Sequence, residues 1–377
     1  MTLFTQIDQP TFLSDYWQKK TCVFTQAFSN LEKIINGDDL KALANEDDCE
    51  ARIITGLGLN NNWQCWHGPF SNQDFQRLDK NNWTLLIQGL DHWNTDVRDI
   101  LLQFDFLPKW RLEDIMASYA SIGGGVGPHF DYYDVFLIQA SGTREWQLGQ
   151  QCNQDTKLQN NTDVKLLAEF NTQETHNVKA GDVLYIPAGL AHWGTASSND
   201  CITLSVGFRA PSHKEILIRS LELLTEELST LEDTTRYQDN ASSIDQNKYK
   251  INQTAISQLN NANISFDSER LEQLKQTAFG QLVTEPRYSE NANLQESLTT
   301  IEIANILKRN QRVELIHTNH TRFAFTEKQL FIDGLSFDIN EHFSKMVCDK
   351  VIDRSLSNDE LNLLVEIIDL GATNLKI

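Results

Sequence analysis

A glycine-rich segment followed at once by a histidine, an aspartate and a β-branched run constrains this chain more than any other feature. The segment reads GGGVGPHFDYYDVF and spans Gly123 to Phe136. Glycine permits turns and close backbone approaches that other residues resist, so we expect residues 123–127 to turn tightly beside other backbone. Aromatic and β-branched residues favour strands. The segment therefore predicts a glycine turn that leads into a β-strand, with His129 and Asp131 where that strand begins.

A histidine and an aspartate two residues apart suit a shared metal ion. Side chains at positions i and i+2 of a strand point to the same face, so His129 and Asp131 project together if residues 128–136 enter a strand. Two histidines and one carboxylate on one face are the ligands of iron(II) oxygenases, which leave the other coordination positions open. The His-x-Asp pair alone arises by chance, and the prediction needs a distant third ligand.

His192 fits the third position. It follows GDVLYIPAGLA, in which Gly181 and Asp182 form a turn, residues 183–186 an apolar strand and residues 187–189 a tight loop. This context places the imidazole at the start of a strand. The other histidines of the chain lack such a frame, and we interpret them as structural or exposed.

Arg144 is the next candidate, because it follows a predicted hairpin turn. The run DVFLIQASGTREWQLG is typical of an apolar strand, a turn at Ser141 and Gly142, and a second strand. The guanidinium is always charged, and its planar donors match a carboxylate. Without the three metal ligands a solvated arginine would be the preferred interpretation. With them, we expect Arg144 to bind a carboxylate such as the distal one of 2-oxoglutarate.

The chain changes character near residue 210. Aromatic and β-rich runs predict a mainly β domain with some early helices at residues 1–210, built as an antiparallel sandwich or barrel. Residues 211–297 carry two helical patterns, of which the first begins after Ser212, a plausible N-cap. Residues 298–377 predict a small module of winged-helix type, in which helices enclose two short strands around a turn.

The sequence does not determine which surface the two helical patterns pack against. The first carries Leu217, Leu221, Leu224 and Leu228, and the second carries Leu271, Leu274 and Phe279. A dimer interface and simple packing against the β domain explain these apolar faces equally well. A polar run between the two patterns, residues 233–250, predicts a surface loop.

Composition limits the classes of function. The chain has 52 acidic and 32 basic side chains and a formal net charge of −20, which argues against a phosphate-binding surface and against DNA binding by the winged-helix-like module. A basic protein partner fits this charge better. The six cysteines are scattered without a CxxC pair, which favours a reducing compartment over a zinc ribbon or a disulfide framework. We also see no secretory signal and no membrane-spanning run, and expect a cytoplasmic protein that binds no membrane.

Three segments together resemble a known family. They are FLPKWRLEDIMASYASIGGGVGPHFDYYDVFLIQASGTREWQLG, PAGLAHWG and SVGFRAP, and they are similar to the bacterial JmjC-type ribosomal oxygenases, the arginine hydroxylases of large-subunit ribosomal protein number sixteen. The resemblance extends to PTFLSDYWQKKTCVF and WQCWHGPF, and faintly to the C-terminal half. It implies a double-stranded β-helix of the cupin and JmjC type, a helical dimerisation region that forms a homodimer, and a winged-helix-like C-terminal domain.

The resemblance also implies a site. Fe(II) would be held by His129, Asp131 and His192, and the co-substrate 2-oxoglutarate would bind the metal. Arg144 would bind the distal carboxylate of 2-oxoglutarate, with Ser118 nearby. With dioxygen, the enzyme would hydroxylate the β-carbon of an arginine in a basic ribosomal protein.

Two residues just after Asp131 are candidates for contact with the substrate. Tyr133 and Asp134 match the family pattern and are candidates for an aromatic and acidic clamp on the substrate guanidinium, although a structural role on the strand is equally open. Tyr132 is less typical of the family and receives no role. Two alternatives stand beside this interpretation: a JmjC hydroxylase of another residue, such as histidine or asparagine, and a non-catalytic cupin-type binding module. The intact ligand set with Arg144 favours an enzyme.

Overall fold

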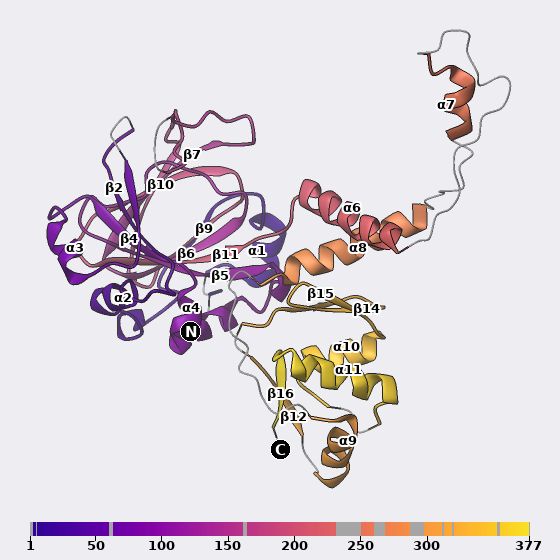
Figure 1. Cartoon of the computed structure of the whole chain (residues 1–377). Helices are drawn as coiled ribbons and strands as arrows, with labels where there is room; N and C mark the ends of the chain where they lie inside the picture. The colour runs from indigo at the N-terminus through magenta and orange to yellow at the C-terminus, as the bar shows by residue number, and fades with distance from the viewer. Residues whose placement is uncertain are drawn as a thin grey trace. The chain divides into compact units, whose positions relative to one another are not determined.

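The chain folds into two compact units, Met1–Ala210 and Pro211–Ile377 (Figure 1). Each unit has a hydrophobic core of its own. The computed structural model describes residues 3–4, 6–59, 63–160, 164–230, 250–259, 268–286, 298–310, 313–318, 320–352 and 355–376. The predicted surface loop at residues 233–250 lies outside the described residues, apart from its last residue.

The first unit is mainly β with helices near its start, as the sequence predicts. Its strands are β1 (Cys22–Phe24), β2 (Ala51–Thr55), β3 (Gln64–His67), β4 (Trp83–Ile87), β5 (Leu112–Ala120), β6 (Asp134–Ser141), β7 (Thr143–Gln151), β8 (Glu174–Lys179), β9 (Val183–Ile186), β10 (Leu190–Ala196) and β11 (Cys201–Phe208). Its helices are α1 (Gln9–Asp15), α2 (Gly37–Leu43), α3 (Asn72–Arg77), α4 (Leu90–Trp93) and α5 (Thr95–Arg98), with short 3-10 turns at Leu31–Lys33, Asp99–Phe104 and Lys109–Arg111.

The strands of the first unit form two antiparallel sheets. The larger has eight strands in the order β1-β9-β6-β11-β5-β4-β2-β3, and the smaller has three in the order β10-β7-β8. Apolar side chains of both sheets meet in one cluster, which includes Leu137 of β6, Leu148 of β7 and Leu184 of β9. The two sheets therefore face each other, and the predicted double-stranded β-helix of the cupin type is confirmed.

The predicted hairpin around Ser141 and Gly142 is wrong. Both strands exist, but β6 pairs with β9 and β11, whereas β7 pairs with β8 and β10 of the other sheet. Every residue of β6 from Asp134 to Ala140 is buried, as in a central strand with both edges occupied. Gly142 carries the chain from one sheet to the other with φ +68°, and a Cβ there would lie 2.6 Å from the Ser198 hydroxyl.

The outer face of the larger sheet holds the main core of the first unit. Phe136 and Ile138 of β6 and Val206 of β11 alternate with the inward residues and pack against the N-terminal helices. Phe12 of α1 is fully buried and contacts the ring of Tyr185 edge-on at 5.1 Å. The N-terminal segment thus closes one face of the sheet, which leaves the other face for the site.

The second unit is α+β, and the predicted mixture of helices and strands is confirmed. Its helices are α6 (His213–Ser229), α7 (Gln253–Leu259), α8 (Ser268–Thr284), α9 (Thr300–Arg309), α10 (Glu341–Cys348) and α11 (Asn358–Asp369). Its strands are β12 (Glu314–His317), β13 (Phe323–Phe325), β14 (Gln329–Ile332), β15 (Leu335–Asp338) and β16 (Thr373–Lys376). The run predicted as two strands around a turn forms three, because the chain turns twice, and β13, β14 and β15 make one sheet.

The helical patterns of the second unit are placed as predicted. Ser212 caps α6 and accepts a hydrogen bond from the Glu215 amide at 3.1 Å. Helix α8 packs on the β13-β14-β15 sheet, where a Cβ on Gly280 would collide with the Phe331 ring. Leu274 of α8 is already buried within this unit, so the expectation that it lies in a dimer interface is wrong.

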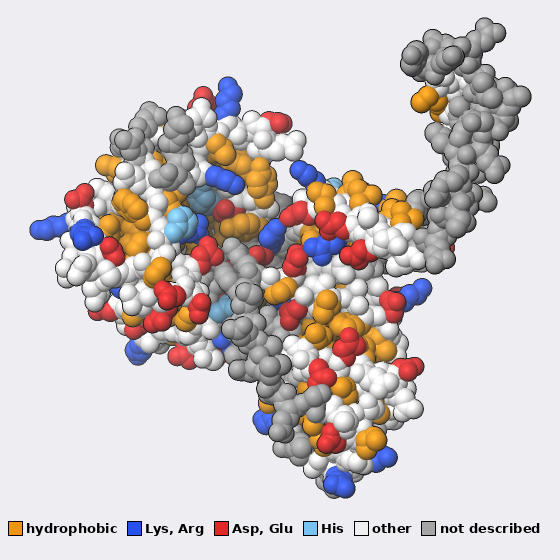
Figure 2. All heavy atoms as spheres, in the orientation of Figure 1, with side chains coloured by type: hydrophobic (Ala, Val, Ile, Leu, Met, Phe, Trp, Pro, Cys, Tyr) orange, Lys and Arg blue, Asp and Glu red, His pale blue; other side chains and the backbone are white. Residues whose placement is uncertain are grey.

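Helix α6 packs against α8 but keeps an apolar face exposed. Leu217 and Leu221 are each 50% exposed and Leu228 is 41% exposed. Figure 2 shows hydrophobic side chains gathered along this helix. None of the described helices combines the length and the apolar character that crossing a membrane requires.

Candidate metal centre

The glycines before His129 allow close backbone packing. Gly123 and Gly127 have φ of +77° and +80°, a region that favours glycine. A Cβ on Gly124 would lie 2.2 Å from the Trp83 carbonyl oxygen, and one on Gly125 would lie 2.4 Å from the Gly194 carbonyl oxygen. The predicted close approach is therefore present, and it brings the segment against β10.

His129 and Asp131 converge, but not because they share a strand. Strand β6 begins only at Asp134. His129 instead forms an isolated antiparallel bridge with His192, with backbone hydrogen bonds of 3.1 and 2.8 Å in the two directions. The Asp131 carbonyl accepts from the Gly189 amide at 2.7 Å. Each residue is thus fixed by a different partner, and the predicted regular strand at residues 128–133 is wrong.

His129, Asp131 and His192 form one cluster. Each offers one ligand atom, and these atoms all lie within 4.8 Å of one another. The Nε2 atom of His192 is 3.6 Å from a carboxylate oxygen of Asp131, and the two imidazole ring centroids are 4.2 Å apart. This is the only such group of three or more possible metal ligands among the described residues.

Backbone carbonyls orient both imidazoles. Nδ1 of His129 is 2.9 Å from the Gly127 carbonyl oxygen, and Nδ1 of His192 is 2.9 Å from the Leu190 carbonyl oxygen. A ring nitrogen that faces a carbonyl carries the proton and donates it. The lone pair therefore resides on Nε2 of each ring, which is the atom available to a metal.

Burial keeps His192 neutral. Its side chain is almost fully enclosed, and this loss of solvent, together with the neighbouring His129, lowers the pKa of His192 to about 4. The imidazole is therefore unprotonated near neutral pH. Metal ligation requires that neutral form, so the cluster fits a cation with nitrogen and oxygen ligands.

Arg144 and Ser118 meet on the inner side of the two sheets. The Arg144 guanidinium donates to the Ser118 hydroxyl at 3.0 Å. Arg144 is only 2% exposed, and its Nε has no hydrogen-bond partner. No described carboxylate forms an ion pair with it. A buried cation without a counter-charge is costly, so this position is suited to an anionic ligand.

Arg144 and His192 face the same interior. In the smaller sheet Arg144 is paired with Ala196, Trp146 with Gly194, and Leu148 with His192, and directly opposed residues project to one side. The Trp146 ring lies 5.6 Å from the Arg144 guanidinium carbon and 5.9 Å from the His192 ring. The sequence analysis missed Trp146, although the i+2 alternation from Arg144 already placed it on this face.

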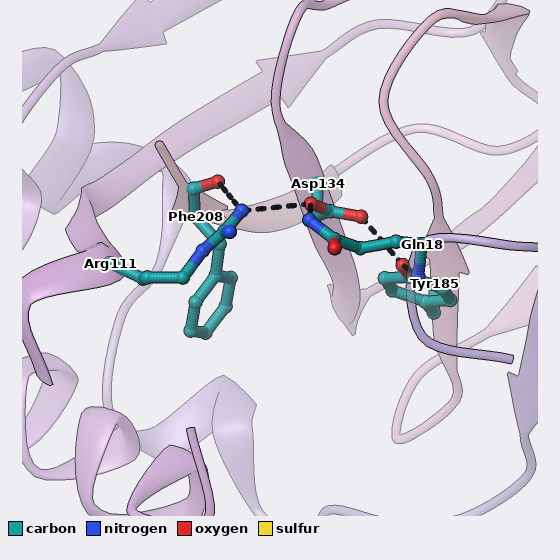
Figure 3. A network of polar contacts seen from close by, with 5 residues as sticks. All are labelled: Gln18, Arg111, Asp134, Tyr185 and Phe208. Atoms are coloured by element: carbon teal, nitrogen blue, oxygen red, sulfur yellow. Dashed lines mark hydrogen bonds and ion pairs between the residues drawn. The ribbon is translucent and has the colours of Figure 1, made fainter. Parts of the chain in front are cut away.

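Asp134 lies in a closed polar network on the opposite face of the larger sheet, shown in Figure 3. Its carboxylate accepts from the Tyr185 hydroxyl at 2.6 Å, from the Gln18 side chain at 3.1 Å and from Arg111 at 3.1 Å. Arg111 also donates to the Phe208 carbonyl at 3.3 Å.

The Asp134 side chain is fully buried. Burial and this carboxylate raise the pKa of Tyr185, so that its hydroxyl remains a donor. Because Arg111 already neutralises the carboxylate, the predicted acidic clamp on a substrate guanidinium is wrong for Asp134. The partners Gln18, Arg111 and Tyr185 were missed, and no local pattern connects such distant positions.

The two tyrosines before Asp134 remain accessible. Tyr132 is 69% exposed and packs edge-on against Phe130, with ring centroids 5.1 Å apart. Tyr133 is 37% exposed and lies near Gly207, where a Cβ would sit 3.6 Å from the tyrosine ring. Tyr133 therefore remains a candidate for contact with a substrate.

Comparison with known proteins agrees with this geometry. Residues 99–216 match the JmjC domain family. The chain carries a JmjC domain. The match contains all three residues of the metal cluster together with Arg144 and Ser118, and it ends just inside α6.

Two curated proteins resemble a little more than half of the chain. A probable ribosomal oxygenase of Haemophilus influenzae is 37% identical over 209 residues, which are 55% of this chain and 50% of that protein. The ribosomal protein uL16 3-hydroxylase of Escherichia coli is 37% identical over 211 residues, which are 56% of this chain and 55% of that protein. The chain thus matches about half the length of these relatives.

A solved structure resembles the JmjC domain and the remainder of the chain. It is that of YcfD, a ribosomal oxygenase from Escherichia coli in complex with cobalt and 2-oxoglutarate. It is 26% identical, covers 99% of both chains and has a TM-score of 0.74. The second unit therefore has a structural counterpart in YcfD as well.

Proposed function

We propose that this protein is an Fe(II)- and 2-oxoglutarate-dependent hydroxylase that acts on the β-carbon of an arginine in a large-subunit ribosomal protein. One observation carries the proposal: the His129, Asp131 and His192 cluster shares an interior with the buried, uncompensated Arg144. A cation site and an anion site side by side suit a metal-bound dicarboxylate.

The cluster fits iron(II). Two neutral imidazoles and one carboxylate form the 2-His-1-carboxylate set that non-haem iron oxygenases use. Iron(II) with dioxygen and a 2-oxo acid supplies oxidation of an unactivated C–H bond, while the acid becomes succinate and carbon dioxide. His129 and His192 would each present Nε2, because their Nδ1 atoms are engaged by carbonyls.

The buried guanidinium fits the co-substrate. Arg144 would bind the distal carboxylate of 2-oxoglutarate and Ser118 would hold the guanidinium in place. The solved relative, which is named as a complex with cobalt and 2-oxoglutarate, supports this assignment. The retained cluster and Arg144 argue against the alternative of a non-catalytic binding module.

The target residue is inferred from the relatives. The Escherichia coli relative is named for 3-hydroxylation of uL16, and position 3 of an amino acid is its β-carbon. The net charge of −20 favours a basic substrate. Tyr133 is the remaining candidate to contact the substrate guanidinium, because Asp134 is closed off.

We further propose a cytoplasmic homodimer. The exposed leucines Leu217, Leu221 and Leu228 of α6 would form the interface, since such a stripe favours burial. None of the six cysteines forms a disulfide, which suits a reducing compartment. Sedimentation at micromolar concentration tests the dimer, and Leu221→Glu should shift the protein toward the monomer.

One experiment tests the function. The iron-loaded protein is incubated with purified uL16 and 2-oxoglutarate, and each peptide of uL16 is then analysed by mass spectrometry for one added oxygen. We expect hydroxylation of a single arginine that requires both iron and 2-oxoglutarate. Oxygen on a histidine or asparagine would favour the alternative substrate class, and no modification of uL16 would contradict the proposal.

A further inference from the structure

The first unit has a surface groove of about 380 Å³. One of its lining residues, Tyr132, is the neighbour in sequence of the candidate metal ligand Asp131. The groove is lined by Tyr132, residues 151–155 at the end of β7, and the turn at residues 188–189. The groove is joined to the cluster through backbone: Tyr132 follows Asp131 directly, and the Gly189 amide donates to the Asp131 carbonyl at 2.7 Å. A ligand in the groove would therefore lie near the backbone of Asp131, one of the three candidate metal ligands.

The walls of the groove are fixed by hydrogen bonds. The Cys152 amide donates to the Gly189 carbonyl at 2.7 Å, and the Gln151 side chain donates to the Ala188 carbonyl at 3.0 Å. The Asp155 amide donates to the Asn153 side chain at 2.9 Å, which holds that turn. The lining is thus formed in advance, so binding there costs little ordering of the protein.

Tyr132 is an unusual surface residue. At 69% exposed, it is the most exposed large aromatic side chain among the described residues, ahead of Trp66 at 43%. Its ring is nevertheless held, because Phe130 packs edge-on against it at 5.1 Å and belongs to the cluster around Leu167. An aromatic ring that is exposed yet braced is suited to contact a partner.

The chemistry of the lining favours a cation. Asp155 is exposed and is the only charged residue that lines the groove, and the remaining polar lining is made of amides. The ring face of a tyrosine attracts a guanidinium or an ammonium group. A carboxylate and a ring in one groove, whose lining contains no basic residue, complement a positive side chain.

We propose that this groove binds a basic side chain of the substrate protein that flanks the residue presented to the metal, with Tyr132 stacking on the cation and Asp155 neutralising it. The inference rests on the proposed function for the nature of the substrate. It assigns a role to Tyr132 and separates substrate capture in the groove from the chemistry at the metal.

The test measures binding without turnover. Fluorescently labelled uL16 is titrated with metal-free protein, and the anisotropy gives the dissociation constant. Tyr132→Ala should weaken binding about tenfold, and Tyr132→Phe, which keeps the ring, should stay within about twofold of the parent. Asp155→Asn should weaken binding about threefold at low salt, and the difference should shrink at about 0.5 M salt because an exposed charge is screened.

Two matched variants control for general effects. Trp93→Ala removes another exposed aromatic ring of the same unit, and Asp79→Asn makes the same charge change at an exposed position that does not line the groove. Both should bind uL16 like the parent. An equal loss in Asp79→Asn would assign the effect to the overall charge and overturn the groove.

The outcomes separate this inference from the proposed function. If Tyr132→Ala binds uL16 as tightly as the parent, the groove proposal is wrong whether or not uL16 is hydroxylated. If Tyr132 and Asp155 matter for binding but the iron-loaded parent adds no oxygen, the groove stands and the proposed reaction fails. If the metal-free parent does not bind uL16 at all, the groove proposal is overturned, and the hydroxylation assay alone decides the proposed reaction.

Discussion

Two arginines lie on opposite sides of the larger sheet, and their arrangements differ: Arg144 is buried, whereas the Arg111 side chain is 15% exposed. On the outer face Arg111 is paired with Asp134 at 3.1 Å, within a network that Tyr185 completes. On the inner face Arg144 contacts only the neutral hydroxyl of Ser118 among the described hydrogen bonds. Both arginines leave Nε unbonded, so an unbonded Nε alone does not distinguish them.

The counter-charge distinguishes the two sites. In a buried ion pair the two charges neutralise each other, so the pair needs no ligand and its role is structural. A buried cation without a carboxylate nearby gains a counter-charge only when an anion binds. The comparison therefore teaches that burial of a charged residue is not by itself a sign of function, whereas burial without a partner next to a metal cluster is.

The largest effect is expected at the inner face, from loss of a metal ligand. Mutation of residues that orient a metal ligand costs about 10–100-fold in metal affinity or activity, and His192→Ala removes one of the proposed ligands itself, so turnover of 2-oxoglutarate should fall below detection. Asp131→Asn should do the same with less change of shape. Metal content and turnover are measured together, with thermal unfolding as the check on folding. Full activity in either variant would sink the assignment of the cluster.

At the outer face, breaking the ion pair should affect stability instead of chemistry. Asp134→Ala removes the fully buried partner of Arg111, whose own side chain is 15% exposed, and should lower the free energy of unfolding by about 3 kcal/mol. Urea denaturation measures this, and Asp38→Ala, at a carboxylate 95% exposed, is the control and should cost less than about 0.5 kcal/mol.

The milder variant at the same position tests function directly. Asp134→Asn should leave the preference for an arginine substrate over a lysine substrate unchanged, because the carboxylate faces Arg111 and not the substrate. Loss of that preference in a folded variant would restore the acidic clamp to Asp134.

The sequence predicted the inner site better than the outer one. The cluster and Arg144 were found because their residue types are specific to a chemistry and each lies in a local frame of glycines and strands. The strand expected around His129 was wrong because its backbone bonds to several partners in turn. The network around Asp134 was invisible, since Gln18 lies 116 positions away and amide, tyrosine and arginine side chains have many other uses.

The same distinction applies to the fold. Capping residues such as Ser212 act within one turn of helix, so α6 began where the local pattern placed it. Strand partners depend on distant segments, so the run around Gly142 was assigned as a hairpin although its two strands belong to different sheets. Local sequence signals determine where helices and strands form, whereas the pairing of strands depends on the whole chain.

A further test sharpens the contrast between the two arginines. Arg144→Lys keeps the charge but loses the planar donors, so the 2-oxoglutarate concentration for half-maximal rate should rise about tenfold or more, with a smaller change in kcat. Arg111→Lys makes the same substitution on the outer face and should leave that concentration unchanged. Steady-state turnover of both variants checks this, and equal effects would remove the distinction drawn between the two sites.

The smallest effect concerns Asp91, a buried carboxylate that Arg111 does not reach. Its Oδ1 accepts the Ile115 amide at 2.8 Å, and its nearest basic group is His92 at 3.7 Å. Burial raises the pKa of Asp91 to about 6 from its ordinary value of 3.8. The folded chain therefore binds this proton more tightly than the unfolded chain, so the stabilising contribution is full below pH 3.8 and is lost as the pH rises through about 6.

Asp91→Asn cannot ionise and keeps an oxygen for the Ile115 amide, so it should escape this loss. The free energy of unfolding of this variant, relative to that of the parent, should increase by about 1–3 kcal/mol as the pH rises from about 4 to 7. Urea denaturation at several pH values measures the difference, and Asp38→Asn should show no such trend. A constant difference between Asp91→Asn and the parent across that range would mean that Asp91, like Asp134, is fully compensated in the folded protein.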